Sequence, residues 1–272
     1  MSTELVLTPG TGFVAELRRR SPTLTSFGIA CLLAGAVTLC LPLVDARQFG
    51  GAPVWLKPTK FFLSFGLFAL TSAWFIGYVR PERRMARPLR VATLMLVAAG
   101  SFELGYITLQ AGQGQASHFN VGDPIHGLLY ALMGVGALTL LASKIPLAIE
   151  IAGNPVTGLP PALRLALVLG LCITIVFGGA GGILISLNHG TVIGPVGPRL
   201  PVFGWNLGGG DLRIGHFLGM HAEQVLPLAA LAIEALRFSF QRSLVVGTAL
   251  FWAGLSILAI LQARAGLAFP FG

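Results

Sequence analysis

The amino-acid sequence predicts an all-α protein that crosses a membrane several times. Of its 272 residues, 54% are hydrophobic and only 10% are charged, and the mean hydropathy is +0.81. About a quarter of the residues of a soluble domain are charged, whereas each membrane-spanning helix consumes about 20 apolar residues. The composition therefore excludes a water-exposed globule. Helices are the expected spanning elements, because backbone groups in lipid must be paired within one segment.

Seven apolar runs predict a polytopic helix bundle of about seven transmembrane helices in a single integral membrane domain, residues 1–272. Prolines at Pro22, Pro124 and Pro161 support three of the helix starts, and Pro81 follows the second run. The expected helices are 24–44, 59–79, 91–111, 125–143, 162–187, 214–236 and 243–263.

Basic residues predict how these helices are oriented. With the N-terminus inside, twelve of the 18 Lys and Arg residues fall on the inner side and six on the outer side. Because cytoplasmic loops carry an excess of such residues, we expect an N-inside, C-outside protein of the inner (plasma) membrane, with an uncleaved first helix. The net charge of +8 is then an orientation signal, so the expected partner is the lipid bilayer and not nucleic acid.

All five histidines fall in the outer half of the predicted bundle. His118 lies in the loop before the fourth helix, His126 opens that helix and His189 closes the fifth, while His216 and His221 occupy the first two turns of the sixth. Imidazoles at one depth on separate helices predict a shared site, built by helices three to six.

Two carboxylates lie in the same zone, Glu103 in the third helix and Glu223 in the sixth. An ionisable residue inside a membrane indicates a functional site, because placing it in lipid is costly. Glu103, Tyr106 and Gln110 recur at i, i+3 and i+7, so they form one polar stripe that must face protein or water. In the structural alternative each acid pairs with a base, and the candidate bases are Lys57, Lys60 and Arg213.

Helical geometry separates the side chains of the sixth helix. Glu223 lies about 20° from His216 in projection, whereas His221 lies about 140° away from it. The two histidines cannot easily hold one small ion together. We expect one of them to be a ligand and Gln224 to orient an imidazole.

The segment 188–213 is the longest predicted outer loop and contains Trp205. It is either a lid over the site or an ordered connector. At its end, Asp211 and Arg213 are expected to guard the entrance or to cap the next helix. In the fifth helix Gly178 opens a GxxxG motif, which predicts close helix packing or clearance for a flat macrocycle.

These residues predict a b-type haem, or another transition metal (iron, copper or zinc), used in redox chemistry. The expected ligands are His126 and His221 as an axial pair, with His189, His216 and His118 as further candidates. The acids expected to relay protons or to bond the ligands are Glu103 and Glu223. Zinc would instead indicate a membrane hydrolase.

A third interpretation needs no metal. Glu103, Glu223 and His221 would then be the titrating groups of a proton-coupled transporter or of a receptor for a small ligand. A small or lipophilic substrate suits each interpretation, and the oligomeric state stays open.

Three strings carry a resemblance to known proteins: WLKPTKF at Trp55–Phe61, QGQASHFN at Gln113–Asn120 and GDLRIGHFLGMHAEQVLP at Gly210–Pro227. They resemble a widespread group of multi-pass bacterial membrane proteins with no assigned activity, over most of the chain. The resemblance implies that these outer-side strings belong together, and it transfers no catalytic role to any residue.

Overall fold

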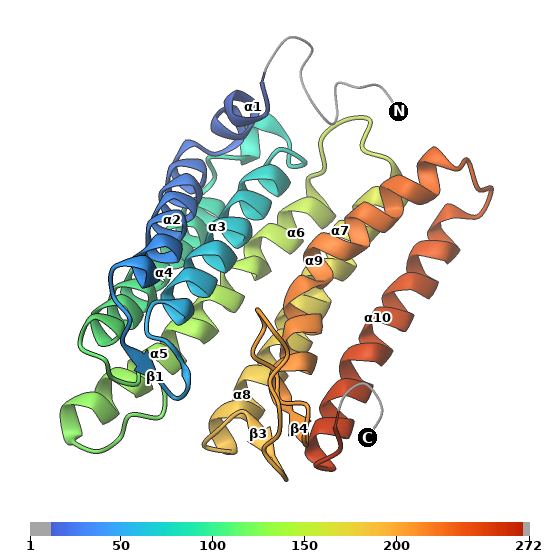
Figure 1. Cartoon of the computed structure of the whole chain (residues 1–272). Helices are drawn as coiled ribbons and strands as arrows, with labels where there is room; N and C mark the ends of the chain where they lie inside the picture. Colours follow the sequence, from blue (N-terminus) through green and yellow to red (C-terminus); the bar gives the residue numbers. More distant parts are fainter. Residues whose placement is uncertain (1–11, 269–272) are drawn as a thin grey trace. The chain divides into compact units, whose positions relative to one another are not determined.

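The computed structural model describes residues 12–268, most of which are helical. The chain divides into two compact units, residues 1–158 and 159–272. Each unit has its own set of packed helices (Figure 1).

The first unit consists of helices joined by short connectors (Figure 1). Two short strands form an antiparallel hairpin in which Gln48 pairs with Pro53. In chain order the elements are α1 (Phe13–Arg20), α2 (Pro22–Cys40), a 3-10 turn (Leu41–Leu43), β1 (Gln48–Phe49), β2 (Ala52–Pro53), α3 (Leu56–Ile76), a second 3-10 turn (Pro81–Arg83), α4 (Arg87–Gly112), α5 (Pro124–Ala142) and α6 (Lys144–Gly153).

Prolines and one carboxylate determine where helices of this unit begin. Pro22 and Pro124 occupy the first turns of α2 and α5, where a missing N–H group loses no hydrogen bond. Asp123 caps α5, because its side chain accepts hydrogen bonds from the N–H groups of Ile125 and His126 at 2.9 and 3.0 Å.

The sequence does not predict α1, which has only eight residues. Its buried Glu16 pairs with Arg20 at 2.8 Å, and the Arg20 guanidinium lies 3.8 Å from a ring centre of Trp74 in α3. Phe13 stacks on the Trp74 side chain. Contacts with α3 hold this polar helix, so a search for apolar runs misses it.

The second unit is organised around α9, which packs against α7, α8 and α10 (Figure 1). A short antiparallel strand pair joins Val192 to Asp211 at the start of α9. The elements are α7 (Pro161–Ile173), a π-helical turn (Thr174–Gly178), α8 (Gly179–Leu187), β3 (Val192–Ile193), β4 (Gly210–Asp211), α9 (Leu212–Ala235) and α10 (Gln241–Arg264).

Glycines let the helices of the second unit approach α9 closely. A Cβ atom on Gly178 would lie 2.7 Å from the sulfur of Met220, and one on Gly181 would lie 2.7 Å from Cα of His216. The glycine-rich stretch of the predicted fifth helix is therefore a packing surface, as small residues usually are in membrane helices.

Helices occur at all seven predicted runs. Within residues 12–268, six helical segments are long and apolar enough to cross a membrane, which is the pattern of a multi-pass membrane protein. These segments are 22–43, 56–76, 87–112, 124–153, 161–187 and 241–264. Although α9 has 24 residues, it is not one of the six. Between residues 213 and 224 it carries five polar side chains, those of Arg213, His216, His221, Glu223 and Gln224.

Several predicted helices differ from the structure in their details. The first helix ends at Cys40 and not at 44, and the third begins at Arg87 and not at 91. The second helix ends at Ile76 and not at 79, because the chain turns there and Val79 forms an antiparallel bridge with Pro155. The fourth continues beyond Ser143 as α6, and the fifth is interrupted by the π-helical turn. Such changes depend on contacts that apolar periodicity does not reveal.

Candidate functional site

The polar stripe of α4 is buried in the first unit. Glu103 and Gln110 are only 4% and 2% exposed, and Tyr106 between them packs with Ile107 and Met133. Oε1 of Glu103 and Oε1 of Gln110 make no hydrogen bond within the described part of the chain. Buried oxygens of this kind are uncommon, because an unmade hydrogen bond costs about 1–3 kcal/mol.

The Glu103 carboxyl faces a glycine of α5. A Cβ atom on Gly136 would lie 3.0 Å from Oε1 of Glu103, so the absence of a side chain there leaves room beside the carboxyl. The acid is thus held between two helices without a basic partner at this oxygen.

A lysine and a histidine of the first unit meet at the start of α3. Nζ of Lys57, at the start of α3, lies 3.0 Å from Nδ1 of His118 in the loop before α5. Because an ammonium group only donates, Nδ1 accepts this hydrogen bond and the imidazole proton is on Nε2. Burial, together with the Lys57 charge, lowers the pKa of His118 to about 3, so the ring is neutral at physiological pH.

An exposed ion pair closes the same end of the unit. Arg47 pairs with Asp45 at 2.7 Å and donates to the carbonyl of Gly112 at 3.0 Å, which joins the hairpin region to the end of α4. Trp55 also donates to Asp45, at 2.7 Å. The hydrogen bonds from Arg47 and Trp55 hold the pKa of Asp45 well below its usual range.

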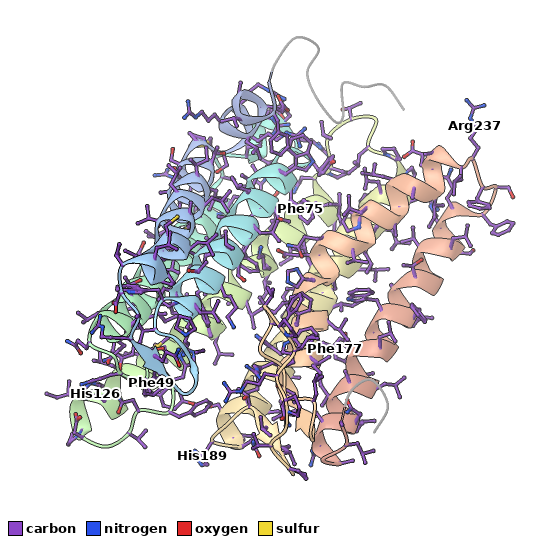
Figure 2. All side chains as sticks on the ribbon, in the orientation of Figure 1. Phe49, Phe75, His126, Phe177, His189 and Arg237 are labelled. Atoms are coloured by element: carbon purple, nitrogen blue, oxygen red, sulfur yellow. The ribbon has the colours of Figure 1, made fainter. Side chains whose placement is uncertain are left out.

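His126 is bonded locally, at the partly exposed start of α5 (Figure 2). Its Nδ1 lies 2.5 Å from Oδ2 of Asp123, the residue that caps the helix. Hydrogen bonds from the backbone and ring of His126 lower the pKa of Asp123. The other histidine proposed as an axial ligand, His221, belongs to the second unit.

In the second unit His216 points at α8. Its Nδ1 lies 2.8 Å from the carbonyl oxygen of Gly178, so Nδ1 donates and Nε2 carries the lone pair. The His221 ring lies 4.2 Å from that of Phe217, which in turn contacts Trp205 and Phe203 of the preceding loop.

The two other polar residues predicted on α9 lie beside the π-helical turn. Glu223 is fully buried, and its backbone N–H donates to Oγ1 of Thr174 at 3.1 Å. The Gln224 amide donates to Oε1 of Glu223 at 3.1 Å. π-Helical turns often occur at functional sites, and the sequence did not reveal this one.

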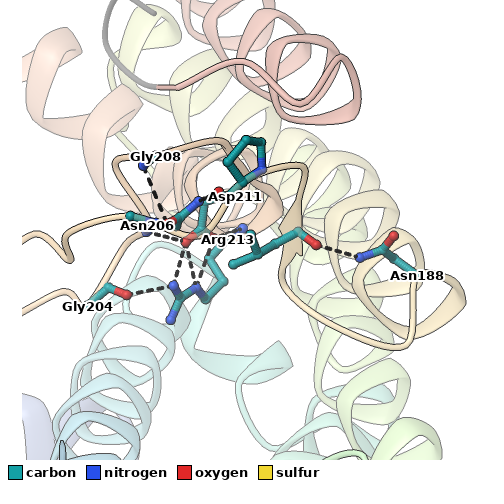
Figure 3. A network of polar contacts seen from close by, with 9 residues as sticks. Asn188, Gly204, Asn206, Gly208, Asp211 and Arg213 are labelled. Atoms are coloured by element: carbon teal, nitrogen blue, oxygen red, sulfur yellow. Dashed lines mark hydrogen bonds and ion pairs between the residues drawn. The ribbon is translucent and has the colours of Figure 1, made fainter. Parts of the chain in front are cut away.

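A polar network holds the long loop of the second unit (Figure 3). Asp211 is fully buried and accepts hydrogen bonds from the N–H groups of Asn206 and Arg213 at 2.7 and 3.0 Å, so the predicted cap of α9 is confirmed. The guanidinium of Arg213 pairs with Asp211 and donates to the carbonyl of Gly204 at 2.6 Å. These contacts anchor the loop to the start of α9.

His189 is exposed at the end of α8, where its backbone adopts a φ of 50° (Figure 2). Within residues 12–268 no three His, Cys, Asp or Glu side chains lie close enough together to hold one metal ion.

Sequence reasoning missed the Lys57–His118 contact and the place of Gly136. The nearest signal was the expectation from the sequence that the string containing Lys57 and the string containing His118 belong together. Comparisons of the chain with protein-family models, curated proteins and solved structures find no match, so its function is inferred from its own side chains.

Proposed function

We propose that the chain is a seven-helix protein of the plasma membrane, N-inside and C-outside, whose first unit binds a small polar ligand from the outer side and couples binding to protonation of Glu103. This is the metal-free alternative among the functions predicted above. The observation that carries it is the buried Oε1 of Glu103, which has no hydrogen-bond partner in residues 12–268 and faces Gly136.

The buried carboxyl of Glu103 destabilises the protein unless another group interacts with it. Leaving a charge in the membrane interior costs at least about 2–3 kcal/mol, and in this unit the described side chains do not offset that cost at Oε1. Protonation, or a polar group of a ligand, supplies the missing interaction.

Polar groups also extend from this carboxyl toward the end of α4. Glu103 lies nine residues before Gly112, which is roughly 14 Å along a helix. Tyr106 and Gln110 lie on the same face within that length. They provide hydrogen-bonding positions for water or for a ligand that approaches Glu103.

Vesicles with a pH-sensitive dye inside test the proposal. The purified protein is exposed to a panel of small carboxylates, amines and sugars, and the internal pH is followed. We expect at least one compound to drive proton movement, and Glu103→Gln to reduce the rate about tenfold or more, as loss of about 1.4 kcal/mol would. Glu82→Gln, on an exposed connector, is the matched control.

Proton movement that persists unchanged in Glu103→Gln would refute the coupling. The melting temperature of each variant is measured alongside. If Glu103→Gln fails to fold while Glu103→Asp folds without proton movement, the carboxyl has a structural role only.

A second candidate, a histidine-bound haem b or other metal in the second unit, is favoured by the His216 contact. An imidazole whose Nδ1 donates to a backbone carbonyl keeps its Nε2 lone pair available, as metal-ligating histidines usually do. A Soret band or stoichiometric iron, copper or zinc in the purified protein, reduced in His216→Ala and His221→Ala, would support it. Unchanged content in both variants would remove these residues as ligands.

A further inference from the structure

We infer that the ligand of the first unit is a small anion, held by the ammonium group of Lys57 and the Nε2–H group of His118. This inference rests on the proposed function, because it names the ligand class of the same site. The two side chains come from α3 and from the loop before α5, and a 3.0 Å hydrogen bond joins them.

The contact between Lys57 and His118 leaves donors and no acceptor. An ammonium group has three N–H donors, of which His118 takes one, and the imidazole still has its own N–H at Nε2. Lys57 forms no ion pair with a carboxylate of residues 12–268. A ligand with a negative charge and acceptor oxygens complements this pair.

The local backbone adds positive potential. Lys57 and Lys60 fall within the first five residues of α3, whose N-terminus has no side-chain cap and no acidic residue in its first turn. The N-terminal end of a helix carries a partial positive charge, which adds to the charge of the Lys57 ammonium group and favours an anion at this position.

Aromatic rings shield the pair from water. The ring centres of Phe61 and Tyr130 lie 5.8 and 6.2 Å from that of His118. Because the effective dielectric constant is lower in such surroundings, an anion is attracted to Lys57 more strongly than it would be in bulk water. His118, kept neutral by burial, acts as a donor at every physiological pH.

Packing contacts of Phe61 connect the Lys57–His118 pair to the part of α4 that carries Glu103. Phe61 packs against the cluster that contains Tyr106, which is one turn from Glu103 on α4. An ionised Glu103 repels an anion in this region, so anion binding favours the protonated carboxyl and is tighter at lower pH. The titratable and charged groups of the surrounding elements are Lys57 and Lys60 on α3, Glu103 and Tyr106 on α4, His118 and Asp123 in the loop, His126 and Tyr130 on α5, and Asp45 and Arg47 before α3. The two carboxylates among the loop residues already have partners, because Asp45 pairs with Arg47 and Asp123 with the ring of His126.

Calorimetry on the purified full-length protein in phosphatidylcholine nanodiscs tests this inference. The probes are sodium lactate, inorganic phosphate and lactamide, which resembles lactate but has no charge. We expect an anion to bind and lactamide not to bind. Lys57→Gln should weaken anion binding about tenfold or more, as loss of one charge-assisted hydrogen bond would, and Lys57→Arg should retain most of it. Arg264→Gln, an exposed change of equal charge, should have no effect.

Titration in two buffers of different ionisation enthalpy measures proton uptake, which we expect in the wild type and not in Glu103→Gln. The anion site is overturned if neither anion binds, if lactamide binds as tightly as lactate, or if Lys57→Gln binds like the wild type. Loss of uptake in Glu103→Gln with unchanged affinity in Lys57→Gln would overturn the anion site alone. Weakened anion binding in Lys57→Gln, together with unchanged proton uptake in Glu103→Gln, would overturn proton coupling alone.

Nanodiscs that contain phosphatidylglycerol separate a lipid headgroup from a free anion as the source of this chemistry. If the headgroup occupies the site, the affinity for soluble phosphate falls in those nanodiscs. If a free anion is the ligand, the affinity is the same in both. Either result supports an anion site, provided that binding depends on Lys57.

Discussion

Replacing Gly181 by alanine tests the contact that positions His216. The added methyl group would lie 2.7 Å from both Cα and Cβ of His216 and 3.1 Å from its backbone nitrogen. Ordinary carbon–carbon contact begins at about 3.5 Å, so the backbones of α8 and α9 must separate by most of an ångström. Overpacking of this kind costs about 1–3 kcal/mol, and the higher helix propensity of alanine offsets about 1 kcal/mol of it.

The next residue is a matched control. A Cβ atom on Gly182 would lie 3.6 Å from the nearest atom of the His216 ring, which is an ordinary contact. Gly182→Ala should therefore gain helix propensity without strain and stabilise the protein by up to about 1 kcal/mol.

Unfolding in a graded mixture of mild detergent and dodecyl sulfate, followed by circular dichroism, measures both variants. We expect Gly181→Ala to be less stable than Gly182→Ala by about 1–3 kcal/mol, the size of the overpacking cost. If the two variants are equally stable, α8 and α9 do not approach each other at Gly181, and the derived position of His216 is wrong.

Two further predictions concern His118 and Asp211. Burial lowers the pKa of His118 from an ordinary 6.5 to about 3, so between these pH values the unfolded chain binds a proton that the folded chain does not. The free energy of unfolding therefore falls as the pH drops below 6.5. In denaturant titrations, His118→Gln should reduce the difference in this free energy between pH 7 and pH 5 by about 2 kcal/mol. Asp211→Asn should destabilise the second unit by about 1.5–3 kcal/mol and speed proteolysis within 190–209, because charge-assisted hydrogen bonds from Arg213 are lost. The same change at Asp45, which pairs with an arginine in the first unit, should leave that cleavage rate unaltered. The first expectation is contradicted if the free energy of unfolding changes equally with pH in the wild type and in His118→Gln. The second is contradicted if Asp211→Asn is cleaved at the wild-type rate.

Local patterns predicted much of the helical structure. The apolar runs are helical because a segment of that length and composition can satisfy its backbone groups only internally once it is in lipid. Helix starts at Pro22 and Pro124 and the cap at Asp211 follow from groups within three residues of each start. The polar stripe of Glu103, Tyr106 and Gln110 likewise follows from helical spacing alone.

Contacts between distant residues were decided only by the tertiary structure. Lys57 and His118 are 61 positions apart, and nothing in the spacing of either string determines that one accepts a hydrogen bond from the other. Gly136 came to face Glu103, and Gly181 came to face His216, through the rotation of each helix about its axis, which depends on the packing of all its neighbours. The sequence by itself therefore determined which segments are helices and which polar side chains share a helix face. Only the packing of whole helices decided which of those side chains meet, because the orientation of a helix is set by the sum of its contacts and not by its own residues.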